Sequence, residues 1–573
     1  MKSPFGPQSV LRTPKGRKWL IASVAVLVVV GLVAGLWSPV STAVAAKRVE
    51  LLNDRIARIY TSSYQTKAQK DLVSDRDSKT HDEDSIYTSE NPYGTSTSGL
   101  YVYFTTKRAA KVTYRVSTTN TDYPDYAATP KGGDSYSTKH EFQAVGLVPG
   151  ETNTVTLTIT YRNGESITRT ITQKSSDKLG PEESRLTSTK ANSGQNLGNG
   201  LYAILGNDSD EQDYLFYYDT HGVLRAEIPI LYYRAHRLLF SKGLMYFSAS
   251  TRYIVGMNRL GRIVKFLYTG DNYILHHDYA LDSDGNLVVL ATDTRRKTIQ
   301  DAIIKIDTTT GKVTLLADMA KIYKSYMNST AFASMSGKAT SSSSNSDTTN
   351  DKSRHYNADS TPTKKDWLHL NTIQLLPDGS AIVSSRETST AIKLDNIESD
   401  PTIDYMIGEK SFWKNTDYAK YLLTKIGDSY GTGGQHTITY DPDSSLPDGQ
   451  YYLYMFDNNY GLSNTRPNYD WKAHNADIQT SYATGTHSKY YKFLVDEKAK
   501  TYKLVKSFDV PFSPIVSSVQ ELSNGTILVD SGTKGIIGVY DTDGNLISQW
   551  KMTVIKNIIY RVYQYDFSGF YFA

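Results

Sequence analysis

The segment AIIKIDTTTGKVTLL, residues 302–316, consists of an apolar run, a polar turn ending in glycine, and a second apolar run. This arrangement is typical of a β-hairpin, in which two antiparallel strands are joined by a short turn. The same unit returns five more times along the chain, at 216–228, 253–267, 390–406, 490–508 and 536–550. Recurrence of one supersecondary unit predicts a repeat architecture.

A second type of hairpin lies between these units and turns on Asp-Gly or Asn-Gly. It is clearest at 276–293, 369–387, 436–458 and 513–532, with a fifth example at 236–249 and a weaker sixth near 201–207. Two hairpins make a four-stranded sheet, so residues 195–573 predict a six-bladed β-propeller, whose radial closure leaves few strand edges open. The last segment, IIYRVYQYDFSGFYF at 558–572, has the composition of a strand and is expected to complete a blade at the start of the propeller.

The chain before the repeats has a different organisation, although the protein as a whole is predicted to be mainly β. Apolar and polar residues alternate between 97 and 173, and Asn163-Gly164 predicts a tight turn between two strands, which together indicate an immunoglobulin-like β-sandwich over 91–180. Residues 47–90 are expected to form a helical stalk and linker. A serine-rich insert near 336–364 is too poor in apolar residues to pack and is expected to be disordered.

The first 46 residues have the composition of a membrane-targeting segment. Five basic residues precede an uncharged apolar run from Trp19 to Trp37, which is about long enough to cross a bilayer as a transmembrane helix. Basic charge before the run predicts a cytoplasmic N-terminus and a single-pass cell-membrane protein with its body on the extracellular side. The segment Ala43-Val44-Ala45 resembles a signal-peptidase site, so cleavage and secretion remain the alternative.

Composition excludes several classes of function. The chain has no cysteine, so disulfides, thiolate metal sites and thiol nucleophiles are all absent. A formal net charge of +4 without a basic stripe argues against nucleic acid as a partner. No glycine-rich phosphate cradle is present, which argues against a nucleotide donor, and no cofactor is expected. The sequence does not fix the oligomeric state, for which a homodimer is one option.

Three of the eleven histidines occupy similar places in successive repeats. His277, His369 and His436 each open the Asp-Gly hairpin of a different predicted blade, so their imidazoles should converge at one end of the central channel. Arg386 ends the strand that pairs with the one begun by His369, and Asn371 follows two residues after that histidine. Three readings stay open at this point: surface histidines placed by chance, a zinc or copper site, and a site for an anion with several oxygens.

At these residues the chain resembles the bacterial arylsulfate sulfotransferase family. The resemblance lies in short segments at equivalent blade positions: HHD at 276–278, DWLHLN at 366–371, SSR at 384–386, GQH at 434–436, MFDN at 455–458 and, more weakly, SPIVSS at 513–518. It spans about 90–573 and implies a cofactor-independent sulfotransferase that moves a sulfuryl group from an aryl sulfate ester to a phenolic acceptor by a ping-pong mechanism through a sulfohistidine.

The resemblance also implies roles for individual residues. His436 would be the nucleophile and His277 the acid and base, with His276 as the fallback, while His369, Arg386 and Asn371 would surround the sulfuryl group and Ser517 would add an oxygen near it. Trp367, Tyr454, Tyr232 and Tyr233 are candidates to stack on aryl rings. Thr437 stands where the family commonly has an acidic residue, which leaves the partner that orients His436 unassigned. The alternatives are a non-catalytic binding propeller displayed at the surface and a metal-dependent hydrolase that uses the histidines.

Overall fold

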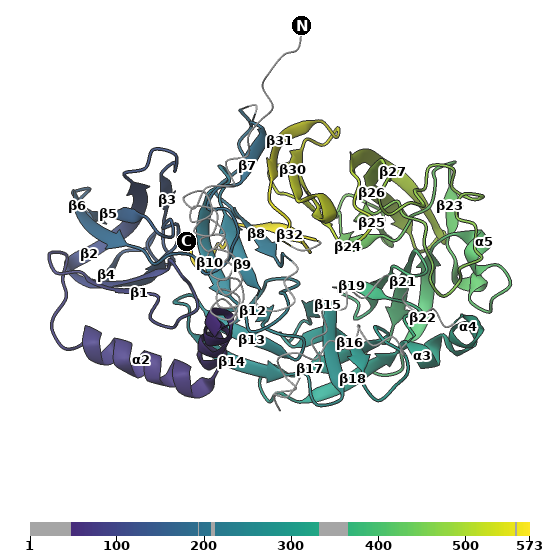
Figure 1. Cartoon of the computed structure of the whole chain (residues 1–573), viewed down its shortest axis with the longest axis horizontal. Coiled ribbons are helices and arrows are strands. Elements are labelled where there is room, and N and C mark those ends of the chain that lie inside the picture. The colour runs from purple at the N-terminus through teal and green to yellow at the C-terminus, as the bar shows by residue number, and fades with distance from the viewer. Residues whose placement is uncertain (1–46, 193, 208–212, 332–364, 556–557) are drawn as a thin grey trace, which may run out of the picture. The chain divides into compact units, whose positions relative to one another are not determined.

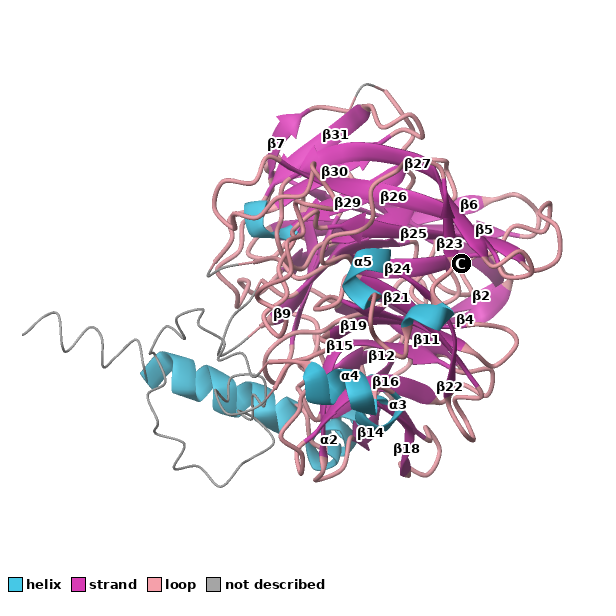
Figure 2. Cartoon of the chain, turned by 90° about the vertical axis from the view of Figure 1, so that its right-hand side faces the viewer, coloured by secondary structure: helices cyan, strands magenta, loops and turns pink. Residues whose placement is uncertain are grey.

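The computed structural model describes residues 47–192, 194–207, 213–331, 365–555 and 558–573. The chain divides into two compact units, Met1–Arg58 and Ile59–Ala573. The apolar run 19–37 and the serine-rich insert lie outside the described residues. Among the residues that are described, no helix is both long and apolar enough to span a bilayer. Residues 47–58 of the first unit are helical. Strands dominate the second unit, and its helices are few and short apart from α2 (Figure 2).

Helix α2 (Ser62–Arg76) precedes the first sheet and is docked on the body of the second unit. Its N-cap is Thr61, whose side chain accepts a hydrogen bond from the backbone N–H of Tyr64 at 3.3 Å. Gln65 is buried and its Oε1 accepts a hydrogen bond from the backbone N–H of Ile263 at 3.2 Å. This part of the expected stalk is therefore held against strand β14 (Ile263–Tyr268).

The first sheet is antiparallel and has six strands. They are β1 (Tyr87–Glu90), β2 (Leu100–Thr118), β3 (Tyr126–Ala128), β4 (Ser137–Ala144), β5 (Thr152–Tyr161) and β6 (Ser166–Lys174). The alternation predicted for β5 is confirmed, because Val155, Leu157 and Ile159 are buried. The predicted turn between β5 and β6 is also present, with Gly164 at φ +83°, a left-handed conformation that glycine adopts without strain.

Six further sheets follow, five of them purely antiparallel, while the fifth also contains one parallel strand pair (Figure 1). The first contains β8 (Leu201–Leu205), β9 (Tyr214–Tyr218), β10 (Leu224–Pro229) and β32 (Val562–Tyr565); the second contains β11 (Leu239–Ser241), β12 (Leu244–Ser248), β13 (Tyr253–Asn258) and β14; the third contains β15 (Tyr273–Leu281), β16 (Leu287–Asp293), β17 (Ala302–Ile306) and β18 (Val313–Asp318). The fourth contains β19 (Leu370–Leu375), β20 (Ala381–Ser385), β21 (Thr390–Asp395) and β22 (Thr402–Ile407); the fifth contains β23 (Thr424–Ile426), β24 (His436–Asp441), β25 (Gln450–Asp457), β26 (His487–Asp496) and β27 (Thr501–Pro511); the sixth contains β28 (Ser518–Glu521), β29 (Ile527–Ser531), β30 (Ile536–Tyr540), β31 (Leu546–Lys551) and β7 (Thr187–Lys190). All six hairpins of the first predicted type are present as antiparallel strand pairs.

Short helices lie in the connections. They are α3 (Met319–Ile322), α4 (Lys324–Ser329), α5 (Lys410–Trp413) and the 3₁₀ turns η3 (Ala419–Tyr421) and η4 (Gly532–Lys534). Helices α3, α4 and α5 bury Tyr323, Tyr326 and Trp413 in one aromatic core.

Segments from the two ends of the second unit meet in the same sheets. Strand β32 pairs with β8, with Val562 opposite Ile204, and β7 pairs with β31 on the outer edge of the sixth sheet. The prediction that the last segment returns to the start of the repeats is confirmed, because β32 completes the sheet of β8, β9 and β10. Pairing of these strands satisfies backbone groups that would otherwise be left at open sheet edges.

We call β32, β11, β15, β19, β24 and β28 the central strands, because each is the edge strand of its sheet that lies towards neighbouring sheets. The buried carboxylate of Asp278 in β15 joins four of the six sheets. It accepts two hydrogen bonds from Arg237, which precedes β11, and it lies 3.0 Å from the guanidinium of Arg561, which precedes β32. It also accepts a hydrogen bond from the backbone N–H of Ile373 in β19 at 3.2 Å.

Asp278→Asn should destabilise the protein strongly. The substitution keeps the shape of the side chain but leaves Arg237 and Arg561 facing each other without an anion, and breaking a buried ion pair costs about 3–5 kcal/mol. Thermal unfolding followed by circular dichroism should show a large fall in the midpoint temperature. Asp284→Asn, in the exposed turn of the same hairpin, is the matched control, and equal midpoints for the two variants would contradict the role given to Asp278.

Candidate functional site

The histidines singled out in the sequence lie where central strands begin or where their pairing is interrupted. His277, His369 and Thr437 have φ values of +53°, +52° and +52°. The pairing registers of β15, β19 and β24 shift at these same places. Left-handed conformation is costly for residues with a Cβ, and such outliers concentrate at functional sites. The interruptions turn side chains away from the ordinary alternation of a strand.

The histidine rings form a compact cluster. The ring centroids of His277 and His369 are 4.7 Å apart, and those of His276 and His277 are 5.2 Å apart. His276, His277 and His436 are buried, whereas the side chain of His369 is 14% exposed. Burial lowers the pKa of His276 to about 3 and holds the pKa values of the other three well below their ordinary range. These imidazoles are therefore neutral at physiological pH.

Asn458 determines the orientation of the His436 ring. Its Oδ1 lies 2.7 Å from Nδ1 of His436, which also lies 3.3 Å from the carbonyl oxygen of Gly434. The Nδ2 of Asn458 donates hydrogen bonds to the carbonyls of Ser513 at 2.7 Å and Val516 at 3.1 Å. Since the amide nitrogen is committed to two acceptors, the oxygen must face the imidazole, and Nδ1 must carry the hydrogen. Nε2 then carries the lone pair, and it has no hydrogen-bond partner among the described residues.

Arg386 brings a positive charge to the cluster. Its backbone N–H donates to the carbonyl of His369 at 3.1 Å, and its Cγ lies 3.9 Å from where a Cβ on Gly434 would stand. After burial, its charge contributes to the lowered pKa of both His369 and His436. Within the described ranges no side chain or carbonyl accepts a hydrogen bond from its guanidinium, which is the condition expected of a group that binds an anion.

Asp366 forms a pair with His369 that the sequence did not assign. Its Oδ2 lies 2.5 Å from Nδ1 of His369. Burial raises the pKa of Asp366 to about 7, although the nearby charge of Arg386 opposes this effect. Asp366 and His369 lie only three residues apart in DWLHLN, which was the one sequence signal for this pair. A strand pattern does not predict it, because side chains three residues apart point to opposite faces of a strand.

His277 is engaged at both ring nitrogens. Nδ1 lies 3.0 Å from the hydroxyl of Tyr560, and Nε2 lies 3.1 Å from Oε1 of Gln300. The Tyr560 hydroxyl also donates to the backbone carbonyl of His277 at 2.9 Å. His276, the fallback, is buried with no hydrogen bond of normal geometry at either ring nitrogen within the described residues. Neither ring has one nitrogen bonded to a partner and the other without one among the described residues, as His369 and His436 do.

Two of the predicted substrate-binding residues form hydrogen bonds from their side chains to backbone groups around the cluster. Asn371 donates from Nδ2 to the carbonyl of Gln435 at 2.8 Å, next to His436. Ser517 is buried at φ +84° and its hydroxyl accepts a hydrogen bond from the backbone N–H of Gly532 at 3.0 Å. These bonds fix the chain around the cluster.

The structure does not bring the predicted aromatic residues to the histidines. Trp367 is fully buried in the aromatic core beside Tyr323, and its Nε1 donates to Asp301 at 2.9 Å. Tyr454 packs against Tyr490 in the core between the fifth and sixth sheets. The ring centroid of Tyr233 lies 6.2 Å from that of His236, which is not one of the four clustered histidines.

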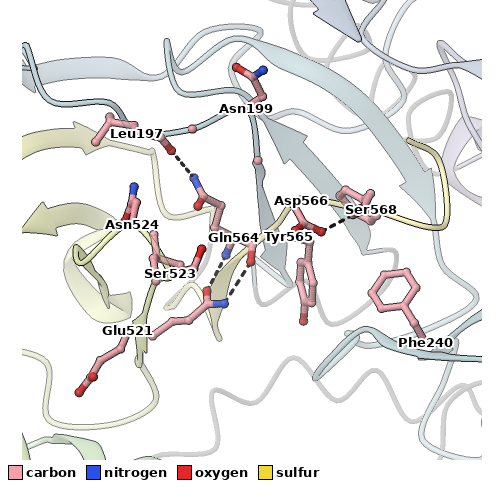
Figure 3. A pocket seen from close by; sticks show the side chains of 15 residues that line it. Leu197, Asn199, Phe240, Glu521, Ser523, Asn524, Gln564, Tyr565, Asp566 and Ser568 are labelled. Atoms are coloured by element: carbon pink, nitrogen blue, oxygen red, sulfur yellow. Dashed lines mark hydrogen bonds between the residues drawn. The ribbon is translucent and has the colours of Figure 1, made fainter. Parts of the chain in front are cut away.

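An open cavity of about 410 Å³ lies at the opposite ends of the central strands (Figure 3). Strands β28 and β32 run from the histidine end to Glu521 and Tyr565, which line it. Gln564 donates two hydrogen bonds there, from its backbone N–H to Oε1 of Gln520 at 2.8 Å and from Nε2 to the carbonyl of Leu197 at 3.2 Å. This cavity is separate from the histidine cluster.

Glu387, next to Arg386, anchors a segment beside the site. Its carboxylate accepts hydrogen bonds from the backbone N–H and hydroxyl of Thr465 at 2.6 and 2.8 Å, and its carbonyl accepts one from Ser463. Burial, followed by the charge of Asp366, raises the pKa of Glu387 from 4.5 to about 7. The folded protein therefore holds a proton on this carboxyl that the unfolded chain releases.

Glu387→Gln should change how stability depends on pH. Between pH 4.5 and about 7 the wild-type carboxyl is protonated in the folded state and ionised in the unfolded state, so it lowers the free energy of unfolding by about 1.4 kcal/mol for each pH unit of increase. The glutamine cannot ionise, so the variant should gain in melting temperature relative to wild type across that window. Glu398→Gln, at an exposed position, should show a constant difference, and a constant difference for Glu387→Gln would contradict the raised pKa.

Comparison with known proteins gives a clear result at the level of the family. No curated protein matches the sequence. Solved structures with some similarity include a protein of unknown function from Bacteroides caccae (10% identity, 64% of this chain and 100% of that chain, TM-score 0.36). A periplasmic gluconolactonase from Pseudomonas aeruginosa (8%, 79% and 99%, 0.33) and a virginiamycin B lyase from Staphylococcus aureus (9%, 64% and 88%, 0.31) are others. At these scores the similarities define neither fold nor function.

Family models match most of the chain. Residues 87–176 match the arylsulfotransferase Ig-like domain, which covers the first sheet. Residues 186–561 match the arylsulfotransferase (ASST) family, which covers every strand of the six sheets except β32 and includes every residue of the histidine cluster. The chain belongs to the arylsulfotransferase family.

Proposed function

We propose that this protein is an aryl-sulfate sulfotransferase in which the six sheets are the blades of a β-propeller and the histidine cluster is the active site. The observation that carries the proposal is the pairing of a buried neutral imidazole, whose Nε2 is free, with a guanidinium that has no hydrogen-bond partner among the described residues. A neutral imidazole is a nucleophile, and a guanidinium holds oxyanions by paired hydrogen bonds. Together they fit a sulfate ester.

In the first half-reaction, Nε2 of His436 attacks the sulfur of the donor. An N–S bond forms while the S–O bond to the aryl group breaks, and the phenolate leaves. The imidazole gains positive charge as the bond forms, which the Oδ1 atom of Asn458 stabilises through Nδ1–H. Arg386 stabilises the charge on the sulfuryl oxygens, as cationic side chains do in phosphoryl transfer.

In this proposal His369 is the acid of the first half-reaction and the base of the second, and Asp366 exchanges a proton with it. The protonated carboxyl of Asp366 donates its hydrogen bond to Nδ1 of His369, so Nε2 of the same ring carries a hydrogen. Nε2–H protonates the departing phenolate, and the carboxyl proton of Asp366 moves to Nδ1 at the same time. In the second half-reaction the same Nε2 accepts the proton of the incoming phenol, whose oxygen attacks sulfur and breaks the N–S bond. This assignment replaces His277, whose ring nitrogens are both bonded to buried partners, and gives that residue the role of supporting the His369 ring.

The proposed location is the outer face of the cell membrane, with residues 19–37 as anchor. The support for it is the sequence alone: a basic N-terminus followed by an uncharged apolar run. An aryl sulfate donor that needs no intracellular nucleotide is consistent with a reaction outside the cell.

His436→Ala should abolish transfer from 4-nitrophenyl sulfate to phenol, because the covalent route is lost, with a fall of several orders of magnitude in kcat. Intact-mass measurement after mixing wild type with donor alone should show one added sulfuryl group, and peptide mapping should place it on His436. His221→Ala, at an exposed turn, should retain wild-type turnover. Full turnover by His436→Ala, or loss of wild-type turnover on adding a chelator, would refute the mechanism.

Asp366→Asn should slow transfer from donors with poor leaving groups more than from donors with good ones. The amide cannot relay a proton to His369, so phenyl sulfate should lose about 10²–10⁴-fold in kcat/KM, the usual contribution of general acid catalysis. 4-Nitrophenyl sulfate, whose phenolate leaves readily without protonation, should lose much less. Asp428→Asn, an exposed substitution, is the control, and equal losses with both donors would assign Asp366 to structure alone.

A further inference from the structure

The contacts of Asn458 go beyond holding a ring in place. The residue is fully buried at the end of β25, and each of its side-chain polar atoms is bonded: Nδ2 to two backbone carbonyls and Oδ1 to Nδ1 of His436. The two carbonyls belong to Ser513 and Val516, in the connection that leads to β28. The sixth sheet therefore determines which end of the amide faces the nucleophile in the fifth.

We propose that Asn458 is the positioning residue that sets the tautomer of His436, so that Nδ1 holds the hydrogen and Nε2 the reactive lone pair. The inference rests on the proposed function of His436 as nucleophile. A ring with the opposite tautomer would place a hydrogen on Nε2 and could not attack sulfur. An amide that cannot rotate excludes that tautomer, because the bare Nδ1 would then face the Oδ1 atom of Asn458, leaving two acceptors with no hydrogen between them.

A neutral partner suits this site better than a carboxylate would. The titratable and charged groups that face His436 are Arg386, His369 and Arg561, and after burial the first of these does most to keep the imidazole neutral. A carboxylate at 2.7 Å would favour the imidazolium and so remove the lone pair at mildly acidic pH. The amide also raises the pKa of His436 when it accepts the Nδ1 hydrogen, but it adds no negative charge, and burial outweighs its effect.

Asn458→Asp and Asn458→Ala test the proposal in the full-length protein with 4-nitrophenyl sulfate and phenol. Asn458→Ala should lower kcat about 10- to 100-fold, the usual effect of losing the partner that orients a functional histidine, with little change in KM. Asn458→Asp should move the acid limb of the kcat/KM profile upward by at least one pH unit, because the anion raises the pKa of His436. A purely structural role would change stability and leave this limb where it is.

Asn459→Ala is the matched control. It removes an adjacent buried amide that donates to the carbonyl of Asp477 and not to the cluster, so its rate and pH profile should match wild type. Wild-type kcat in Asn458→Ala, or an unmoved acid limb in folded Asn458→Asp, would overturn the role of Asn458. If His436→Ala also kept its turnover, the proposed function itself would fail, which distinguishes the two.

A measurement without activity keeps the proposal testable even where the variants do not fold. Histidine labelled with ¹⁵N in the wild-type protein reports the tautomer of each ring, and the spectrum of His436→Ala identifies the signals that belong to His436. The expected pattern is a protonated Nδ1 and an unprotonated Nε2 at neutral pH. A protonated Nε2 would overturn the proposal.

Discussion

The carboxylate of Asp278, held between two guanidiniums, is the interaction on which the arrangement of the central strands depends. Burial alone would raise its pKa, but the charges of Arg237 and Arg561 outweigh burial and hold the pKa below its ordinary value. Asp278 follows His277 directly, and Arg561 also donates to the carbonyl of Asn371 at 2.6 Å. Through these contacts, the buried charge of Asp278 fixes the backbone next to His277 and, by way of Arg561, the backbone just after His369. A pair of this kind contributes little net stability, but its geometric demands are strict, so it selects one relative position of the strands.

The same region shows how a site can be strongly positive and still contain neutral histidines. Imidazoles near neutral pH would ordinarily titrate, but removal from water and the neighbouring guanidiniums both disfavour their charged form. Carboxyl groups respond in the opposite direction, and burial raises the pKa of both Asp366 and Glu387 to about 7. Protons are therefore available from carboxyls beside the imidazoles that we propose as base and nucleophile.

The pattern of the sequence predicts the sheets well and the side-chain partners poorly. Alternation and Asp-Gly turns are local properties, so the hairpins and even the return of the last strand could be predicted. Convergence of His277, His369 and Arg386 also followed, since it needs only the order of the repeats. The expected place of Trp367 beside an aryl ring did not follow, because its side chain is buried in the aromatic core around Tyr323, and a strand-like composition does not say which aromatic residues line a channel. Asn458 and Asp366 stood within quoted segments, yet their partners come from bonds across sheets that no local pattern encodes.

The pairing of β32 with β8 has a consequence for the timing of activity. Tyr560 and Arg561 come immediately before β32, so the residues that support His277 and Asp278 are synthesised after every histidine of the cluster. Because a ribosome makes the chain from its N-terminus, more than a hundred residues of elongation separate His436, the proposed nucleophile, from Arg561. A nascent chain that has passed His436 but has not reached Arg561 therefore carries that imidazole without the groups that surround it in the folded protein.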